Sequence, residues 1–531
     1  MIKNLLIPRN LDLHHLIAVD LLNYRGATTG ITKQNLAYIV HCIISQWLTY
    51  KRQNRFAKFK PGYVPLCAAY LKGKIPLYQN CIDFLTEMGV IISDNQYIIG
   101  IKCKRYTLDL RYSNKGFCHL PLTGKLKERV YKYYNEKERI EGGILRPIFC
   151  KRMNLLRTLK SPLLQIDIKS AFREIGNKYS LELNEARQLF DKQVRREMMA
   201  VALQKLQVNK HLVNVINNKE FEPKIDASGH RLHSPITRLP KFLRKCIAYD
   251  GQRLVALDLK NSQPYFSTLL LDSRFYISQK RGGVNLKGVF VEMYDMINRD
   301  MGNNTPIMLQ KIAETIDNKG FNVFDNYKKD VLSGNLYERY INVPNDDKDY
   351  QTIRQQVKEN ILTTMYNVPI VQLGGLGGKF VKDYSEVFEI FNLLKSIKTG
   401  RMKVRQRRRG SHIDNREKIV PTPIGRGFDK SLKVLGSNDM EFKDKIPRQV
   451  TCYEVDSGYT MFACLLQRIE SHLLLDVICR KINLAQPNIP LVTIHDSIAT
   501  IPEYIDYVKL TIESELKEIM GCCPILSREP W

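Results

Sequence analysis

The segment 490–502, PLVTIHDSIATIP, constrains the fold more than any other stretch of this chain. Apolar residues on both sides of His495 and Asp496 predict two buried strands joined by a tight turn. Val492 and Ile494 would bury one strand and leave the carboxylate of Asp496 at the tip of the hairpin. A carboxylate in that place suits a metal ligand, although Asp and Ser also favour ordinary turns.

A second carboxylate interrupts an apolar run. Residues 254–259, LVALDL, contain the single charged residue Asp258, and Pro264 soon ends the predicted strand. Burying a carboxylate in such a run is costly unless it binds something or lies at the end of the strand. The alternative is an aspartate that caps the following helix.

Between these two segments lies 354–367, RQQVKENILTTMYN, which contains no Gly or Pro and predicts a helix. Arg354, Lys358 and Tyr366 fall within an arc of roughly 120° on that helix. Such a face could place two cations on phosphates and an aromatic ring under a base or sugar. By itself, the pattern favours an amphipathic helix with a solvated basic edge.

The order of the three segments is specific. A strand with Asp, an R-x3-K-x7-Y helix and an H-D hairpin resemble motifs A, B and C of family A DNA polymerases and phage-type single-subunit RNA polymerases. Thr363 and the H-D-S triplet at 495–497 look like those of the RNA polymerases, whereas the S-Q pair at 262–263 looks like that of the DNA enzymes. This mixture is most similar to the transposon-and-virus branch of the superfamily, over about residues 220–510.

The resemblance implies an α+β right-hand polymerase of palm, fingers and thumb whose two Mg²⁺ ions bind to Asp258 and Asp496. Lys358 and Arg354 would neutralise the triphosphate of the incoming nucleotide. Tyr366 would close over the templating base pair, and His495 would support the primer end.

Two further stretches resemble the segments with which family A DNA polymerases grip primer and template. Residues 228–240, SGHRLHSPITRLP, are similar to the G-R-L-S-S-x-x-P-N-L-Q-N-I-P segment of those enzymes. Residues 467–473, QRIESHL, are similar to the segment that approaches the primer terminus. The residues expected to contact nucleic acid are Arg231, His233, Thr237, Arg238, Gln263 and Gln467.

Three departures from the family pattern leave the choice of sugar open. The spacing from Asp258 to Gln263 is longer than in family A DNA polymerases, and Pro264 replaces the glutamate of their gate against ribonucleotides. Asn367 replaces the glycine that usually follows the tyrosine. The sequence therefore predicts a DNA polymerase for replication or repair of a mobile element or phage, with an RNA polymerase or primase as the alternative.

The charge of the chain favours a polyanionic partner. Lys and Arg total 82 against 54 Asp and Glu, a formal net charge of +28, which favours nucleic acid. No run of about 18 apolar residues predicts a membrane span, and the N-terminus is too polar for a signal peptide. The 12 cysteines include no C-x-x-C pair, so free thiols in the cytoplasm of a bacterial or phage-infected cell are expected rather than zinc or disulfides.

The first of three expected domains, 1–125, contains the order helix, turn, helix, hairpin between residues 64 and 110. This order is typical of a winged helix. A small structural domain with a solvated basic hairpin is the equally weighted alternative. If the segment binds DNA, the residues on phosphates would be Lys72, Lys74, Lys102, Lys104 and Arg105.

The second expected domain, 126–219, reads as a helical, thumb-like region in which Asp167 is either a helix cap or a surface carboxylate, and 220–531 would form the palm and fingers. Residues 374–379, GGLGGK, lack the residues of a phosphate loop and predict a flexible link. Residues 401–409, RMKVRQRRR, would either track single-stranded DNA or form a mobile solvated loop. A third function class also stays open, a non-catalytic DNA-binding replication initiator or regulator with a decayed palm.

Overall fold

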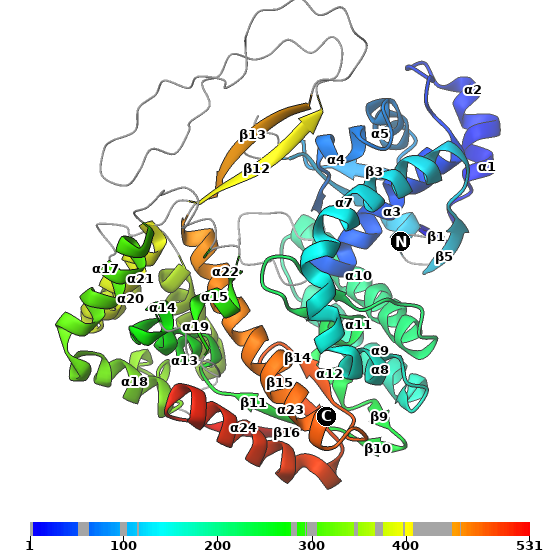
Figure 1. The fold of residues 1–531 in the computed structure, drawn as a ribbon. Helices are drawn as coiled ribbons and strands as arrows, with labels where there is room; N and C mark the ends of the chain where they lie inside the picture. Colours follow the sequence, from blue (N-terminus) through cyan, green and yellow to red (C-terminus); the bar gives the residue numbers. More distant parts are fainter. Residues whose placement is uncertain are drawn as a thin grey trace, which may run out of the picture. The chain divides into compact units, whose positions relative to one another are not determined.

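The computed structural model describes residues 4–50, 63–95, 103–113, 116–277, 284–291, 294, 305–344, 349–366, 375–396, 399–406, 449–456 and 458–531 (Figure 1). Its contacts divide the chain into two compact units. The first comprises 1–227, 232–255 and 530–531, and the second comprises 228–231 and 256–529. The described residues form a mixed α+β structure that is mainly helical and contains several small sheets, which confirms the predicted class at this level.

The N-terminal part of the first unit contains the elements that the sequence predicts between 64 and 110. A long helix, α3 (Lys33–Tyr50), precedes a three-stranded sheet in the order β2-β4-β3. The buried face of α5 carries Cys81, Ile82, Phe84 and Leu85 at helical spacing. The other elements are β2 (Val64–Pro65), α4 (Ala68–Lys72), α5 (Tyr78–Glu87), β3 (Ile91–Ser93) and β4 (Arg105–Leu108).

Two cations expected on phosphates are buried. Lys74 has no exposed surface, and its Nζ donates a hydrogen bond to the carbonyl of Tyr70 at 3.2 Å. Arg105 is 6% exposed because it lies in β4, all four residues of which are buried. The predictions for Lys74 and Arg105 are therefore wrong, since neither side chain reaches the surface. Lys72 and Lys104 are exposed, and Lys102 lies outside the described residues.

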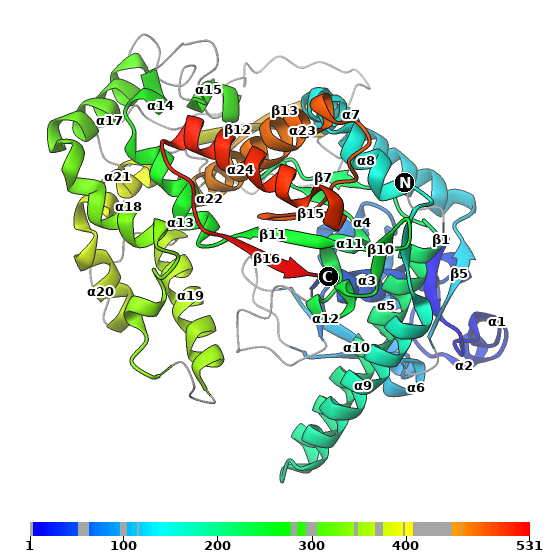
Figure 2. The same cartoon turned by 90° about the horizontal axis from the view of Figure 1, so that it is seen from below.

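The region 126–219 is helical, as predicted. Its helices are α7 (Gly124–Lys151), α8 (Met153–Lys160), α9 (Ile168–Arg187) and α10 (Lys192–Asn217). The carboxylate of Asp167 accepts a hydrogen bond from the backbone N–H of Ser170 at 3.1 Å, which confirms the predicted helix cap. Helices α9 and α10 pack side by side as a long antiparallel hairpin (Figure 2).

The rest of the first unit consists of short elements. Strand β6 (Leu164–Ile166) pairs antiparallel with β9 (Ile247–Tyr249), which in turn pairs with β10 (Gln252–Arg253). Strand β1 (Asn4–Pro8) pairs with β5 (Phe117–Pro121). The remaining elements are α1 (Leu13–His15), η1 (Leu16–Asp20), α2 (Leu21–Asn23), α6 (Leu110–Ser113), β7 (Lys224–Ile225), β8 (Leu232–His233), α11 (Pro235–Arg238) and α12 (Lys241–Arg244).

The second unit is organised around a four-stranded sheet in the order β14-β15-β11-β16. The predicted strand 254–259 appears as β11 (Val255–Leu259), and the predicted hairpin appears as β14 (Val492–Ile494) and β15 (Ser497–Thr500). Strand β16 (Leu526–Pro530) forms the other edge, and α24 (Ile505–Met520) packs on β15 (Figure 2). The predicted strand and the predicted hairpin are both confirmed.

Helices surround this sheet in the second unit. The predicted helix 354–367 is observed as α19 (Tyr350–Tyr366), which contacts the long helix α22 (Gly458–Ser471). The others are α13 (Ser262–Ser267), η2 (Thr268–Leu271), α14 (Arg274–Ile277), α15 (Leu286–Val289), α17 (Thr305–Lys319), η4 (Phe321–Phe324), α18 (Asp325–Leu332), η5 (Glu338–Tyr340), α20 (Gly375–Asp383), α21 (Ser385–Ser396), η6 (His472–Ile478), α23 (Cys479–Ala485) and η7 (Pro502–Tyr504).

Two predicted loops contain regular structure. Residues 375–379 begin helix α20, so they are not a flexible link. Residues 401–406 lie in β12 (Thr399–Gln406), which pairs antiparallel with β13 (Gln449–Asp456), so this part is not a loop. Residues 374 and 407–409 lie outside the described part. No helix among the described residues is long and apolar enough to cross a membrane.

The buried His41 and the partly buried His211 predict sensitivity of the first unit to acid. The Nδ1 atom of His41 accepts a hydrogen bond from the backbone N–H of Leu6 at 2.9 Å, so it must stay unprotonated. Burial, with a smaller contribution from the nearby His119, lowers the pKa of His41 and of His211 to about 4. Between about pH 6.5 and 4 the unfolded chain therefore binds more protons than the folded one, and stability falls as the pH falls.

We expect acidification from pH 7 to pH 5 to lower the free energy of unfolding by about 1–2 kcal/mol for each of these histidines. Urea denaturation followed by circular dichroism at both pH values measures the loss. His41→Gln should flatten the pH dependence, whereas the exposed His15→Gln should not. An unchanged slope in His41→Gln would contradict the assignment.

Candidate active site

The two carboxylates that the sequence singles out lie on neighbouring strands of the second unit. Strands β11 and β15 are adjacent, and the backbone N–H of Leu259 donates to the carbonyl of Asp496 at 3.3 Å. Asp258 directly precedes Leu259 in β11, and both aspartates are partly exposed while the neighbouring strand residues are buried. The structure therefore brings Asp258 and Asp496 to one place on the sheet.

The hairpin turn presents Asp496 in a defined direction. Pairing of Ile494 with Ser497 leaves His495 and Asp496 as a two-residue turn. His495 has φ of 55°, a left-handed conformation that is uncommon outside Gly and that Asn, Asp and His adopt more often than other residues. The hydroxyl of Ser262 donates a hydrogen bond to Oδ2 of Asp496 and holds the carboxylate in place.

The chain turns sharply after β11, and this turn positions α13. Asn261 adopts a left-handed conformation with φ of 55°, and its Nδ2 donates to the carbonyl of Val331 at 3.1 Å. Asn261 and Ser262 are both buried. The strand-to-helix turn thereby places Ser262, the first residue of α13, in contact with Asp496, and Gln263 follows it in the helix.

The predicted basic face of α19 is assembled around one buried tyrosine. The guanidinium carbon of Arg354 lies 5.8 Å from the ring centroid of Tyr337, and Nζ of Lys358 lies 5.9 Å from it. Nε of Arg354 also donates to Oε1 of Glu338 at 2.6 Å. Burial, with smaller contributions from the nearby Tyr327, Tyr366 and Asp496, raises the pKa of Tyr337 well above its ordinary value, so the ring stays neutral.

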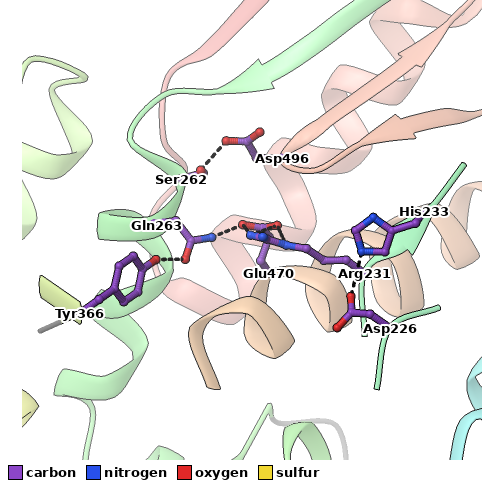
Figure 3. Close-up of polar contacts among 8 residues, drawn as sticks. All are labelled: Asp226, Arg231, His233, Ser262, Gln263, Tyr366, Glu470 and Asp496. Carbon is purple, nitrogen blue, oxygen red and sulfur yellow. Dashed lines mark hydrogen bonds and ion pairs between the residues drawn. The ribbon is translucent and has the colours of Figure 1, made fainter. Parts of the chain in front are cut away.

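A chain of polar contacts links the end of α19 to α22 (Figure 3). The hydroxyl of Tyr366 donates to Oε1 of Gln263 at 2.6 Å, and Nε2 of Gln263 donates to Oε2 of Glu470. Arg231 donates through two nitrogens to the two oxygens of Glu470, each at 2.9 Å. Glu470 is 2% exposed, and burial raises its pKa to about 7 despite the opposing effect of Arg231.

Residues 228–231 lie along α22. Nε of Arg468 donates to the carbonyl of Ser228 at 2.7 Å, and its guanidinium lies 3.8 Å from the ring centroid of Phe290. Gly229 contacts Gln467 closely enough to leave no room for a side chain. Gln467, predicted to contact nucleic acid, thus packs against the segment that was predicted to share that role.

The structure assigns internal partners to other residues predicted to contact nucleic acid. Thr237 is buried, and its hydroxyl completes a capping box with Ser234 at the start of α11, so it has a structural role. Nε2 of His233 lies 3.1 Å from a carboxylate oxygen of Asp226. Arg238 is exposed.

The pair of carboxylates fits a hard divalent cation. Mg²⁺ prefers oxygen ligands, and enzymes commonly hold it by one or two carboxylates together with substrate phosphates and water. Among the described residues, no group of three or more His, Cys, Asp or Glu side chains could hold a metal ion. Asp258 and Asp496 would therefore supply two ligand groups, and bound phosphates would have to supply others.

Sequence reasoning missed three residues of this site, namely Glu470, Ser262 and Tyr337. Glu470 could have been found, because it is the single acidic residue within the largely apolar run LLQRIESHLLL. The sequence identifies Ser262 only as part of the S-Q pair and does not predict its contact with Asp496. Tyr337 carries no local signal, since its place between two cations of α19 depends on tertiary packing.

Comparison with known proteins adds no assignment. A scan against protein-family models gives no match for this chain, and a search of curated proteins finds no significant relative. Only the geometry of the site bears on the function of this chain.

The contact between Gly229 and α22 predicts that a single methyl group disturbs the site. A Cβ atom at position 229 would lie 2.5 Å from Oε1 and 2.9 Å from Cβ of Gln467. We expect Gly229→Ala to destabilise the protein by about 1–3 kcal/mol, measured by thermal or urea denaturation.

Gly176→Ala provides the matched control, because a Cβ there meets nothing within 4 Å. Gly176 lies inside α9, where alanine favours the helix by up to about 1 kcal/mol. Equal effects of the two substitutions would contradict close packing at Gly229.

Proposed function

We propose that this chain is a template-directed nucleotidyl transferase, a Mg²⁺-dependent DNA polymerase that extends a primer. The observation that carries the proposal is the pairing of β11 with β15, which brings Asp258 and Asp496 together in the same unit as the basic helix α19. Two adjacent carboxylates with cations and an aromatic hydroxyl nearby are the groups that phosphoryl transfer to a 3′-hydroxyl requires.

In the proposed reaction the 3′-oxygen of the primer attacks the α-phosphate of a nucleoside triphosphate, and pyrophosphate leaves. Two Mg²⁺ ions held by Asp258 and Asp496 would activate the attacking oxygen and stabilise the charge on the phosphates. Arg354 and Lys358 would bind the triphosphate, with Arg354 exchanging its partner Glu338 for phosphate oxygens. Tyr366 would pack against the base or sugar of the nucleotide, and His495 would support the primer end.

Under this proposal parts of both units have counterparts in a right-hand polymerase. The sheet β14-β15-β11-β16 would be the palm, α19 with the helices around it the fingers, and the hairpin α9–α10 a thumb that follows the duplex. The helices α3, α4 and α5 with the sheet β2-β4-β3 would form a winged helix. Its exposed Lys72 and Lys104 remain suited to phosphates.

A second candidate is an RNA polymerase or primase. The hydroxyl of Tyr366 donates to the amide of Gln263, and Pro264 follows where the related DNA enzymes have a gate glutamate. A neutral amide in place of a carboxylate changes the surroundings of the sugar. The extension assay below therefore compares deoxynucleotides with ribonucleotides.

We expect extension of a primer with template-matched deoxynucleotides in the presence of Mg²⁺, and complete loss of extension with EDTA. Asp258→Asn and Asp496→Asn, which keep side-chain shape but remove charge, should each lower the extension rate at least about 10³-fold. Single-turnover extension on a labelled primer measures the effect. Asp506→Asn, at a carboxylate that is 83% exposed, is the control and should leave the rate unchanged.

Each outcome assigns the chain to one class. Extension with ribonucleotides alone would identify an RNA polymerase or primase. Tight DNA binding without extension by either nucleotide would refute the enzyme and leave the DNA-binding initiator or regulator. Extension that survives in both aspartate variants would refute the proposed site.

The contact of Ser262 with Asp496 predicts weaker metal binding when the hydroxyl is removed. A group that orients a ligand typically contributes 10- to 100-fold to metal affinity, so we expect Ser262→Ala to raise the Mg²⁺ concentration for half-maximal extension by about 10-fold. Ser267→Ala removes a buried hydroxyl of the same helix that bonds to Tyr327 instead. It should leave the Mg²⁺ requirement unaltered, and an equal shift in both variants would contradict the role of Ser262.

A further inference from the structure

We infer that Glu470 is a positioning residue that fixes Tyr366 through Gln263 and couples it to the segment 228–231. The inference deepens the proposed function, because what Tyr366 does there rests on that proposal. The coupling itself is a property of contacts within the second unit and can be tested without any assay of activity.

The contacts form one continuous chain that joins three elements distant in sequence (Figure 3). Tyr366 is the last residue of α19, Gln263 lies in the first turn of α13 and Glu470 lies near the end of α22. Arg231 reaches Glu470 from the segment that Arg468 also binds at Ser228. Glu470 accepts from both Gln263 and Arg231, and it is almost completely buried.

The donors and acceptors of this chain allow only one arrangement. Arg231 carries only donors, so both oxygens of Glu470 must accept from it. The carboxylate has no donor when ionised, so it must be met by Nε2 of Gln263 and not by Oε1. Because that choice turns the amide, Oε1 of Gln263 faces Tyr366 and accepts its hydroxyl.

This polarity explains why a glutamate rather than a glutamine suits position 470. A glutamine there would direct its amino group at one of the two donors, Arg231 or Gln263, and would lose that contact. If the lost contact is with Gln263, the amide of Gln263 is free to turn and present its own amino group to Tyr366. The hydroxyl of Tyr366 would then face an amino group, to which it cannot donate, and would have to turn and accept instead.

Tyr366 lies at the end of α19, where its hydrogen bond to Gln263 can restrain the helix. The last turn of a helix lacks some of its backbone hydrogen bonds and opens more easily than the middle. A side-chain hydrogen bond from the terminal residue to α13 therefore decides how well the end of α19 is held. A change at residue 231 would reach Tyr366 along this chain, through Glu470 and Gln263.

The first test measures structure alone. Hydrogen exchange by mass spectrometry on the full-length protein should show that Glu470→Gln and Gln263→Ala each raise the exchange rate over 358–366 by about tenfold. Gln263→Ala breaks the chain without touching the ion pair of Arg231 with Glu470, so exchange over 228–231 should rise only in Glu470→Gln. Unaltered exchange over 358–366 in both variants would overturn the inference.

A matched control separates the chain from the general effect of a buried ion pair. Glu515 is 6% exposed and pairs with Lys481 in the same unit, away from these contacts. Glu515→Gln should leave exchange over 358–366 as in the wild type. An equal rise in this variant would show general loosening and would refute a specific role for Glu470.

The second test uses nucleotide extension. Glu470→Gln should raise KM for the nucleotide and the frequency of misincorporation about tenfold, and Glu470→Asp, which keeps two acceptor oxygens, should restore part of the loss. The effects of Arg231→Lys and Tyr366→Phe on KM should be non-additive when Glu470 is present and additive in the Glu470→Gln background. Additivity in both backgrounds would refute the coupling. If wild-type protein extends no primer while exchange rises as expected, the proposed function fails and the positioning role stands.

Discussion

The pairing of β11 with β15 is the interaction on which the rest of the site depends. This pairing, which includes the hydrogen bond from Leu259 to Asp496, joins a strand early in the second unit to a hairpin near its end. Because side chains alternate along a strand, the register of this pair decides whether Asp258 faces the site or the core. Shifting the register by one residue would exchange Asp258 with the buried Leu257 or Leu259.

The polar chain through Glu470 shows how the same unit handles a buried charge. A buried carboxylate is destabilising unless partners replace the water that it loses, and burial raises the pKa of Glu470 to about 7 even with Arg231 opposing the shift. Arg231 and Gln263 supply those partners and at the same time tie 228–231 and α13 to α22. The carboxylate is therefore better explained by the arrangement that it imposes than by a gain in stability.

Sequence patterns sufficed for the elements but not for their partners. Apolar periodicity and turn residues located β11, the β14–β15 hairpin, α19 and the cap at Asp167, because each depends on neighbours along the chain. The partners of Arg231 depend on packing, since Glu470 is 239 residues away. The prediction that Lys74 and Arg105 contact phosphates was wrong for the same reason. A long side chain can be buried wherever the fold supplies carbonyls and rings.

Local charge in the site differs from the charge of the whole protein. The chain carries a formal net charge of +28, yet two of the cations near the sheet already have carboxylate partners, Arg231 with Glu470 and Arg354 with Glu338. Asp496 has instead the neutral hydroxyl of Ser262 as its hydrogen-bond partner. Its negative charge thus remains available to a metal cation, while the positive charge elsewhere favours the approach of a polyanion.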